Sequence, residues 1–346
     1  MQGEVVCGIL NANCAFKDFD MEHFSQLLPV ISGKRVLYIT TKNLDYIRVT
    51  QEINLLQDMA DSVTVIGSSA KSYPKRLAHV YASLMKQSMA SIDVTFVGFA
   101  PQLIMPFFYG KLKRKPVIID FFISVYDTMV LDRGKFAPGS LMGRFCHRLD
   151  KNTLRRSDYV VCDTVAHGQF FAAEFTESIS KLRVLYLEAD DSIYYPRPME
   201  EHDTHKVLYF GSILNLQGVD VILEALEHLK DRVDFSFEII GPIREGMARP
   251  TGPNITYTDW LSQQELAEHI AQADLCLAGH FSGTIMKAKR TIPGKAYIYE
   301  AMGRPMILGD GPANHELFES DHNHIFVEMG NASALASAIE SFFNHG

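Results

Sequence analysis

The stretch that decides the fold is KVLYFGSILNLQGVDVILEALEHLK, residues 206–230. It begins with an apolar run typical of a buried strand, continues through a loop with two glycines, and ends with apolar residues at helical spacing. Gly211 and Gly218 allow tight backbone turns between the two elements. Because a helix start presents free N–H groups to an anion, the stretch predicts either a phosphate-binding loop or a plain turn.

The same alternation of apolar runs and amphipathic stretches extends over the whole chain, which is typical of α/β layers built on parallel sheets. In the first half the predicted strands are residues 35–40, 62–67, 93–99, 116–122, 159–164 and 182–188. In the second half they are residues 206–212, 235–241, 255–260, 275–279, 305–310 and 325–329. The polar segment 190–206 contains two prolines and is predicted to be an interdomain linker.

A length of 346 residues favours two domains. We predict a first Rossmann-like domain over residues 1–195, a second over 196–330, and a closing helix over 331–346. Asn331 or Ser333 is suited to cap that helix. Because ligands of open parallel sheets bind beyond the carboxyl ends of the strands, both domains are expected to direct their loops into a shared cleft.

Composition and motif content exclude several classes of protein. The first residues carry no basic start followed by an apolar run, and no segment approaches 18 apolar residues, so neither a secretory signal nor a membrane-spanning helix is expected. Five cysteines without a CxxC pair predict reduced thiols in a cytoplasmic protein. His322 and His324 lack companion ligands, so no metal and no cofactor are expected. GxSxG, HExxH, Walker A and complete GxGxxG motifs are absent from the sequence.

Charge is distributed unevenly along the chain. Residues 1–200 have a net charge of +2 and the remainder has −10, which disfavours nucleic acid as a partner. Residues 133–156 carry seven basic residues and one acidic residue. This segment predicts either a peripheral contact with an anionic membrane face, a contact with a phosphorylated substrate, or a solvated helix face.

A second informative stretch is KAKRTIPGKAYIYEAMGRP, residues 287–305. Lys287, Lys289, Arg290 and Lys295 lie within nine residues and lead into a predicted helix. Four cations at that place predict neutralisation of a diphosphate, against the alternative of an exposed basic loop. Glu300 on the same helix is a candidate for binding ribose or sugar hydroxyls, although a solvent-facing glutamate explains it equally well.

Two strand ends supply further polar candidates. Asp120 ends the strand predicted over 116–122 and could orient substrate hydroxyls, with helix capping as the alternative. Asn314 and Glu316 are predicted to begin a helix after the strand 305–310, facing the cleft.

Taken together, these motifs resemble the GT-B glycosyltransferases of the retaining family-4-like group, glycosyl transferases group 1. The resemblance covers most of the chain and is carried by YFGSILNLQGVDVILEAL (209–226), residues 273–317, residues 325–343 and LRRSDYVVCDT (154–164). It implies two Rossmann-like domains, with a nucleotide-sugar donor held mainly by the second and a saccharide or lipid-linked acceptor held by the first.

The chain departs from the family pattern at the donor site. Where the family usually has Arg and Lys in the first donor loop, this chain has Ser212 and Gln217. Where the family usually has two glutamates eight residues apart, it has Arg290 and Ile298. Glu300 replaces the second glutamate only if the helix is locally shifted, because two residues turn a helix by about 200°.

A subgroup with the pattern K-x-x-R-x-I-P-x-K implies that Lys287, Arg290 and Lys295 take over charge neutralisation. The predicted residues are therefore Asp120 and Glu300 for catalysis, and, for the donor, Gly211, Ser212, Gln217, Lys287, Arg290, Lys295 and Glu316.

These observations favour a cytoplasmic glycosyltransferase that uses a nucleoside diphosphate sugar in the synthesis of cell-surface polysaccharide or a glycoconjugate. The departures keep a rival open, a catalytically silent GT-B partner of an active transferase. A sugar-nucleotide epimerase of related fold is a third interpretation, without identified acid and base residues.

Overall fold

The computed structural model describes residues 24–200, 202–212 and 214–344, and the chain divides into two units, Met1–Glu188 and Ala189–Gly346. The division falls shortly before the predicted boundary at residue 195, and the closing helix belongs to the second unit. The predictions about a secretory signal and about Cys7 and Cys14 concern residues 1–23, which lie outside the described residues.

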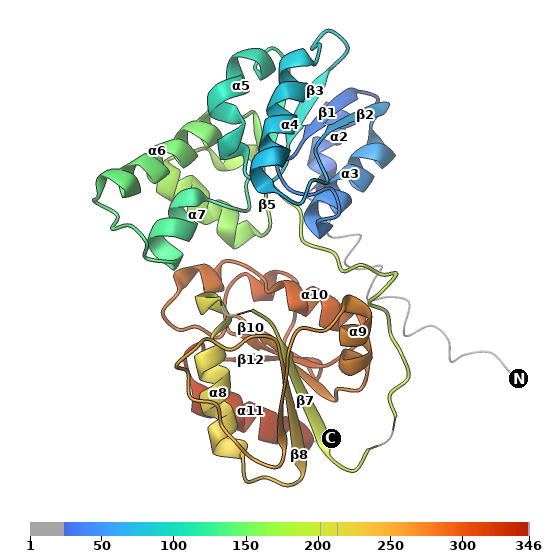
Figure 1. Ribbon diagram of the computed structural model, residues 1–346, viewed down its shortest axis with the longest axis vertical. Helices are drawn as coiled ribbons and strands as arrows, with labels where there is room; N and C mark the ends of the chain where they lie inside the picture. The colour runs from blue at the N-terminus through green and yellow to red at the C-terminus, as the bar shows by residue number, and fades with distance from the viewer. Residues whose placement is uncertain (1–23, 201, 213, 345–346) are drawn as a thin grey trace, which may run out of the picture. The chain divides into compact units, whose positions relative to one another are not determined.

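The first unit is a six-stranded parallel sheet with helices on both faces (Figure 1), in the strand order β2-β1-β3-β4-β5-β6. Its strands are β1 (Arg35–Ile39), β2 (Ser62–Ile66), β3 (Val94–Val97), β4 (Val117–Asp120), β5 (Tyr159–Cys162) and β6 (Leu182–Val184). Its helices are α2 (Leu28–Ile31), α3 (Ile47–Met59), α4 (Tyr73–Lys86), α5 (Met105–Leu112), α6 (Leu141–Arg155) and α7 (Val165–Phe175).

Side-chain alternation along β1 explains why helices cover both faces. Val36 and Tyr38 pack in a cluster with residues of α2 and α3, while Leu37 and Ile39 pack in a cluster with residues of α4, α5 and α7. Because successive side chains of a strand point to opposite faces, the consecutive apolar residues Val36–Ile39 must be buried on both sides.

The second unit has the strand order β12-β11-β10-β7-β8-β9, again parallel throughout. Its strands are β7 (His205–Phe210), β8 (Phe235–Ile240), β9 (Ile255–Thr258), β10 (Leu275–Gly279), β11 (Met306–Gly309) and β12 (His324–Val327). Its helices are α8 (Val219–Leu229), α9 (Gln263–Ala271), α10 (Gly294–Ala301) and α11 (Ala332–Asn344).

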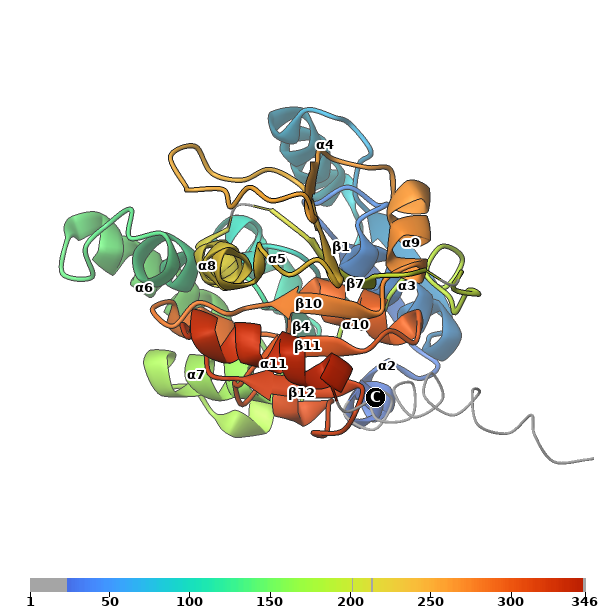
Figure 2. The ribbon, with the colours of Figure 1, turned by 90° about the horizontal axis from the view of Figure 1, so that it is seen from below.

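Helices α8 and α11 pack against each other on one face of the second sheet, and Figure 2 shows α8 and α9 on opposite sides of it. The Asn331 side chain accepts a hydrogen bond from the backbone N–H of Ala334 at 2.9 Å, which confirms Asn331 as a cap of α11. All twelve predicted strands are confirmed, with ends that differ by a few residues.

Two further findings bear on the sequence predictions. Among the described residues, no helix combines the length and the apolar character needed to cross a bilayer. Cys146, Cys162 and Cys276 are buried free thiols, and burial raises the pKa of each, so all three are poor nucleophiles in the folded protein.

The packing of the first unit predicts the effect of a core truncation. Phe121 is fully buried and meets Phe171 edge to face, with ring centroids 4.9 Å apart. Phe121→Ala is expected to lower the free energy of unfolding by about 3–5 kcal/mol, because it removes a buried ring and leaves a cavity. Urea unfolding of the full chain measures this, with Phe107→Ala on α5, where the ring is 70% exposed, as the control. Equal losses in the two variants would contradict the packing.

Candidate functional site

The second sheet contains a topological switch point between its two central strands. Counted along the chain from β7, its order is 3-2-1-4-5-6, so the connections leave β7 and β10 in opposite directions. Ligands of such sheets bind in the crevice beyond the carboxyl ends of these two strands. The loops that follow β7 and β10 contain Gly211, Ser212 and Gln217 on one side and His280 on the other.

Lys295 brings a positive charge to this switch point from α10. Its ammonium donates a hydrogen bond to Gln217 Oε1 and lies 4.7 Å from the ring centroid of Tyr209 and 5.9 Å from that of Phe210. None of the ion pairs found among the described residues includes Lys295. Burial lowers the pKa of Lys295 to about 7, because the charged form loses its hydration and gains no carboxylate.

The hydroxyl of Tyr209 adds a second uncompensated polar group. It is buried and, within the described part of the chain, has no hydrogen-bond partner. Burial also raises the pKa of Tyr209, so the hydroxyl stays protonated and can donate a hydrogen bond. The Lys295 ammonium thus has only a neutral acceptor, and the Tyr209 hydroxyl has none among the described residues. Such an arrangement is expected at a site that an anionic ligand completes.

Glycine is required at two positions around Lys295. A Cβ on Gly279 would lie 2.6 Å from Gln217 Oε1 and 3.0 Å from Lys295 Nζ, and the φ of Gly279 is +87°. A Cβ on Gly218 would lie 2.6 Å from the backbone of both Phe281 and Ser282. Both glycines therefore let the loops after β7 and β10 approach each other, and the N–H of Phe281 donates to the carbonyl of Gln217 at 3.2 Å.

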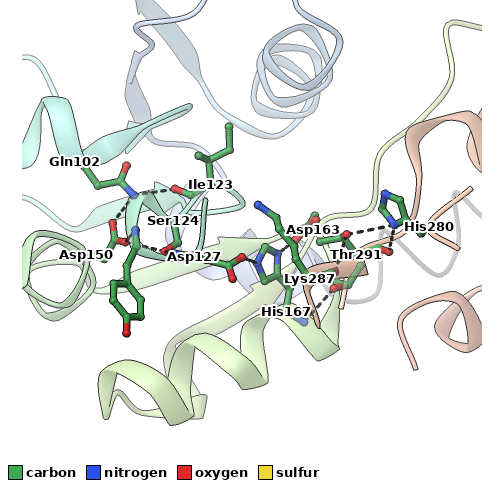
Figure 3. A network of polar contacts seen from close by, with 12 residues as sticks. Gln102, Ile123, Ser124, Asp127, Asp150, Asp163, His167, His280, Lys287 and Thr291 are labelled. Carbon is green, nitrogen blue, oxygen red and sulfur yellow. Dashed lines mark hydrogen bonds and ion pairs between the residues drawn. The ribbon is translucent and has the colours of Figure 1, made fainter. Parts of the chain in front are cut away.

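Lys287 and Arg290 lie in the segment that connects this loop to α10. The segment contains the 3₁₀ turn η6 (Met286–Lys289), and the Thr291 hydroxyl donates to the carbonyl of Lys287 at 3.1 Å. His280 Nδ1 donates to the carbonyl of Thr291 at 2.8 Å, which ties the end of β10 to the start of α10 (Figure 3). Both basic side chains are half-buried.

Glu316 lies in a neighbouring loop of the same unit. The helix predicted to begin near Asn314 is instead the single 3₁₀ turn η7 (Asn314–Glu316), because Asn314 turns inward and its side chain donates to the carbonyl of Gly309 at 2.8 Å. The N–H of Ala313 donates to the carbonyl of Lys289 at 3.2 Å, so this loop packs against η6. Glu316 itself is half-buried.

Glu300 is directed away from the Lys295 cluster. Its carboxylate accepts a hydrogen bond from His324 Nε2 of β12 at 2.7 Å. Although burial opposes it, this hydrogen bond and the charge of Glu300 raise the pKa of His324, so the two groups form an ion pair. The helix carries no local shift, since Lys295 and Tyr299, one turn apart, both face the sheet. The position of Glu300 therefore does not support the predicted catalytic role.

Asp120 ends β4 as predicted but is fully buried in a charged network of the first unit. Arg48 Nη2 donates to Asp120 Oδ1 at 3.1 Å, and Arg48 Nε lies 3.2 Å from Glu52 Oε1. Tyr38 donates to the other oxygen of Glu52 at 2.6 Å. Burial and the nearby charge of Asp120 raise the pKa of Glu52. The position of Asp120 is that of a structural ion pair and does not support contact with substrate.

A polar cluster at the carboxyl ends of β4 and β5 was missed by the sequence reasoning. His167 on α7 is fully buried, with Nδ1 2.7 Å from Asp163 Oδ1 and Nε2 3.5 Å from Asp127 Oδ2 (Figure 3). Asp163 follows β5 directly, and Asp127 begins the π-helical segment η3 (Asp127–Asp132). A signal was present in CDTVAHG, where a strand end, a capping threonine and a histidine follow within six residues.

The first sheet also has a switch point, between β1 and β3, and its backbone is strained there. Phe99 and Ala100 follow β3 with φ values of +34° and +53°, a region that residues other than glycine rarely adopt. Thr41 and Lys42 follow β1, and the Lys42 ammonium lies 5.0 Å from the ring centroid of Phe99. Tyr73 donates to the Thr41 hydroxyl at 3.3 Å. Aromatic rings and hydroxyls at a strand end suit a sugar or another polar ligand.

Two surface hollows lie elsewhere in the units. One, of about 690 Å³, lies beside α6 of the first unit, and one of about 430 Å³ lies between β7, β8 and α9 of the second. Neither includes Lys295, so the donor-site candidate rests on charge and strand-end geometry rather than on depth.

The Asp120 network gives a test of structural against catalytic roles. Asp120→Ala is expected to lower the free energy of unfolding by about 3 kcal/mol, because Arg48 stays buried with one partner fewer. Asp93→Ala, which removes the exposed partner of Arg35, is the control and should cost far less. Urea unfolding measures both. Unchanged stability of Asp120→Ala together with lost sugar transfer would instead assign Asp120 to catalysis.

Comparison with known proteins shows which families and solved structures the chain is similar to. Residues 204–345 match the family model Glycosyl transferases group 1. No curated protein matches the sequence. Among solved structures, sucrose-phosphate synthase from Thermosynechococcus elongatus is similar with a TM-score of 0.63 and 11% identity over 90% of each chain. HepE from Anabaena in complex with UDP has a TM-score of 0.58 and 12% identity over 90% of each chain.

A glycosyltransferase from Rickettsia africae has a TM-score of 0.53 and 14% identity, over 90% of this chain and 88% of that one. At such identities the likeness concerns the fold, and it includes both units. The chain thus has the α/β fold of GT-B proteins, and residues 204–345 of its second unit are similar to the glycosyl transferases group 1.

Proposed function

We propose that the protein is a glycosyltransferase that moves a sugar from a nucleoside diphosphate sugar to a saccharide or lipid-linked acceptor. The observation that carries the proposal is the buried, carboxylate-free ammonium of Lys295 at the switch point of the second sheet. The family match of the same unit supports a nucleotide-sugar donor there. The solved complexes of HepE with UDP and with UDP-glucose support the same class of donor.

In this proposal, positive groups stabilise the diphosphate as it leaves the sugar. Lys295 and the Tyr209 hydroxyl would meet the diphosphate at the strand ends, and Lys287 and Arg290 would add charge from the preceding loop. Cations preorganised where negative charge develops are the main electrostatic means of lowering such a barrier. Lys295 then takes the place of the basic residue that Gln217 replaces, since the two side chains touch.

The remaining donor contacts follow from the loops. Gly211 and Ser212 would allow close backbone approach to the diphosphate, and Glu316 would bind hydroxyls of the ribose or the sugar. Because Asp120 and Glu300 are both engaged in ion pairs, no protein carboxylate is assigned as a nucleophile. This absence of an assigned nucleophile is compatible with retention of anomeric configuration, which the family resemblance favours.

The acceptor is assigned to the first unit, at the strand ends that carry Phe99, Thr41 and Tyr73. A role in cell-surface polysaccharide or glycoconjugate synthesis, a cytoplasmic location and a peripheral membrane contact through residues 133–156 belong to the same proposal.

A second candidate function is a catalytically silent GT-B partner of an active transferase. It is favoured by Ser212, Gln217 and Ile298, which stand where the family usually has charged residues, and by the ion pair that engages Glu300.

Ligand binding and turnover separate the two candidates. Thermal unfolding of the full chain with uridine and guanosine diphosphate sugars is expected to show stabilisation by at least one donor, since a ligand of the folded state raises stability with concentration. Slow hydrolysis of the same donor should accompany binding. If no donor binds or is hydrolysed, the transferase proposal fails, and co-purification with an active transferase would then support the silent partner.

The buried lysine predicts a pH dependence of donor binding. A pKa of about 7 means that Lys295 is mostly charged at pH 6 and mostly neutral at pH 8. Affinity for the donor is therefore expected to fall about tenfold from pH 6 to pH 8 if only the charged form binds. Tyr209, the other titratable group in contact, does not titrate in this range because burial raises its pKa. Isothermal titration calorimetry with a nucleotide sugar, whose diphosphate does not titrate between these pH values, measures the change.

Lys295→Met should weaken donor binding and remove this pH dependence, while Lys230→Met at the end of α8 should retain both. Lys295→Met should also raise the free energy of unfolding at pH 7 by roughly 1–3 kcal/mol, since it removes a desolvated charge. The unfolded state binds more protons between pH 7 and the ordinary lysine pKa, so the wild-type chain gains stability from this group as pH rises through that window. Donor affinity independent of pH in the wild-type chain would contradict the role of Lys295.

A further inference from the structure

Helix α6 exposes apolar side chains in its first turn. Leu141 is 85% exposed and Phe145 is 58% exposed, and Met142 lies between them. Exposed apolar residues are common singly, but three within one helical turn are a contiguous patch. The hollow of about 690 Å³ begins here, and its lining includes Leu141, Phe145, Arg144 and Arg148. Apolar and basic side chains thus share one surface.

The start of α6 is held in place by its own loop. The Ser140 hydroxyl accepts from the N–H of Gly143 at 3.0 Å and donates to the carbonyl of Ala137 at 2.7 Å. A side chain on residue 143 would collide with the carbonyl of Ala137, so glycine permits this close packing. The exposed apolar side chains of the first turn are therefore presented by an ordered helix start.

Few acidic side chains are exposed in this part of the first unit, although Glu174 of α7 lines the hollow, where its carboxylate lies 3.4 Å from His147 Nε2. Residues 101–156 contain eleven basic and four acidic residues, and three of the acidic ones, Asp120, Asp127 and Asp150, are fully buried. Asp150 lies on α6 itself, where its carboxylate accepts hydrogen bonds from Ser124 at 2.7 Å and from Gln102 at 2.9 Å (Figure 3). The outward face of α6 therefore presents arginines without a neighbouring acid from its own helix.

The positive surface continues from the end of α6 to α5. The guanidinium of Arg156 lies 5.2 Å from the ring centroid of Tyr109, and the Lys113 ammonium lies 5.9 Å from the same ring. Phe107 on α5 is also exposed. A basic surface that carries projecting apolar side chains at more than one point suits a planar anionic partner with an apolar interior.

We propose that the α6 surface, defined as Leu141, Met142, Arg144, Phe145 and Arg148, binds anionic phospholipid bilayers. The apolar side chains enter the interface, and the arginines bind lipid phosphates. Each basic residue near an anionic membrane surface contributes about 1 kcal/mol, and apolar insertion adds to it. This deepens the peripheral contact included in the proposed function by naming its residues and its lipid chemistry.

Sedimentation of the full chain with vesicles tests the proposal. Vesicles with about one third phosphatidylglycerol in phosphatidylcholine are expected to bind the protein, pure phosphatidylcholine vesicles much less, and binding should weaken with salt. Arg144→Gln with Arg148→Gln should lower the partition coefficient about tenfold or more. Leu141→Ser with Phe145→Ser should cause a loss of similar size.

Control variants place the same kinds of change on α4 and on the segment that precedes it. Lys71→Gln with Lys75→Gln removes the same charge, and Met85→Ser removes an exposed apolar side chain of the same unit. Equal binding to both kinds of vesicle, or equal losses in the control and α6 variants, would overturn the proposal. Thermal unfolding verifies that each variant folds.

Vesicle binding is measured without donor or acceptor, so it can fail while the proposed transfer reaction stands. Conversely, the α6 variants should keep the thermal stabilisation by a nucleotide sugar, which lies in the second unit. If the α6 variants lose both that stabilisation and vesicle binding, the substitutions have disturbed the fold as a whole. This outcome would also count against an α6-specific surface.

Discussion

The candidate site of the second unit is organised around one costly feature, a lysine ammonium buried without a carboxylate at the ends of β7 and β10. Desolvation of a charge is unfavourable, and the hydrogen bond to Gln217 offsets only part of it. The lysine is nevertheless held in place, because Tyr299, one turn later on α10, is fully buried and packs edge to face on Phe210 at 5.5 Å. In the proposed function, an anion bound at Lys295 would offset the remaining cost of burying its charge.

Backbone irregularity follows the same geometry in both units. Four residues other than glycine have positive φ in the described part of the chain, and three of them, Phe99, Ala100 and His280, lie within three residues of the ends of β3 and β10. These strands border the switch points of the two sheets. The fourth, Thr176, ends α7, where a left-handed residue is ordinary. Strain is therefore concentrated where parallel strands open towards ligands, which is expected if the loops are shaped for binding rather than for stability alone.

The sequence was sufficient for the strands, the two-unit organisation and the clustering of Gly211, Gln217 and Lys295, because periodicity and loop chemistry are local. It was insufficient for side-chain partners that are distant in the chain. Asp120 was predicted to meet substrate, yet Arg48, 72 positions earlier, occupies it.

Glu300 likewise meets His324, on a strand that the sequence could place but not orient. His167 was not predicted as a site residue, because its interest depends on two carboxylates, Asp127 and Asp163, that lie on different segments of the chain. Charged side chains are the least predictable because either a ligand or a buried partner satisfies the same requirement.

Charge placement links these points. The chain is acidic overall, but the first unit buries three of the four acids of residues 101–156 and leaves the bases at least partly exposed. The second unit carries the acidic excess yet keeps Lys287, Arg290 and Lys295 around one strand end. Net charge alone would have suggested a protein repelled by phosphates. Because screened charges act over about 8 Å in physiological salt, the local placement of charge matters more for binding than the net charge. Residues 133–156 and 287–295 both carry more basic residues per length of chain than the sequence as a whole.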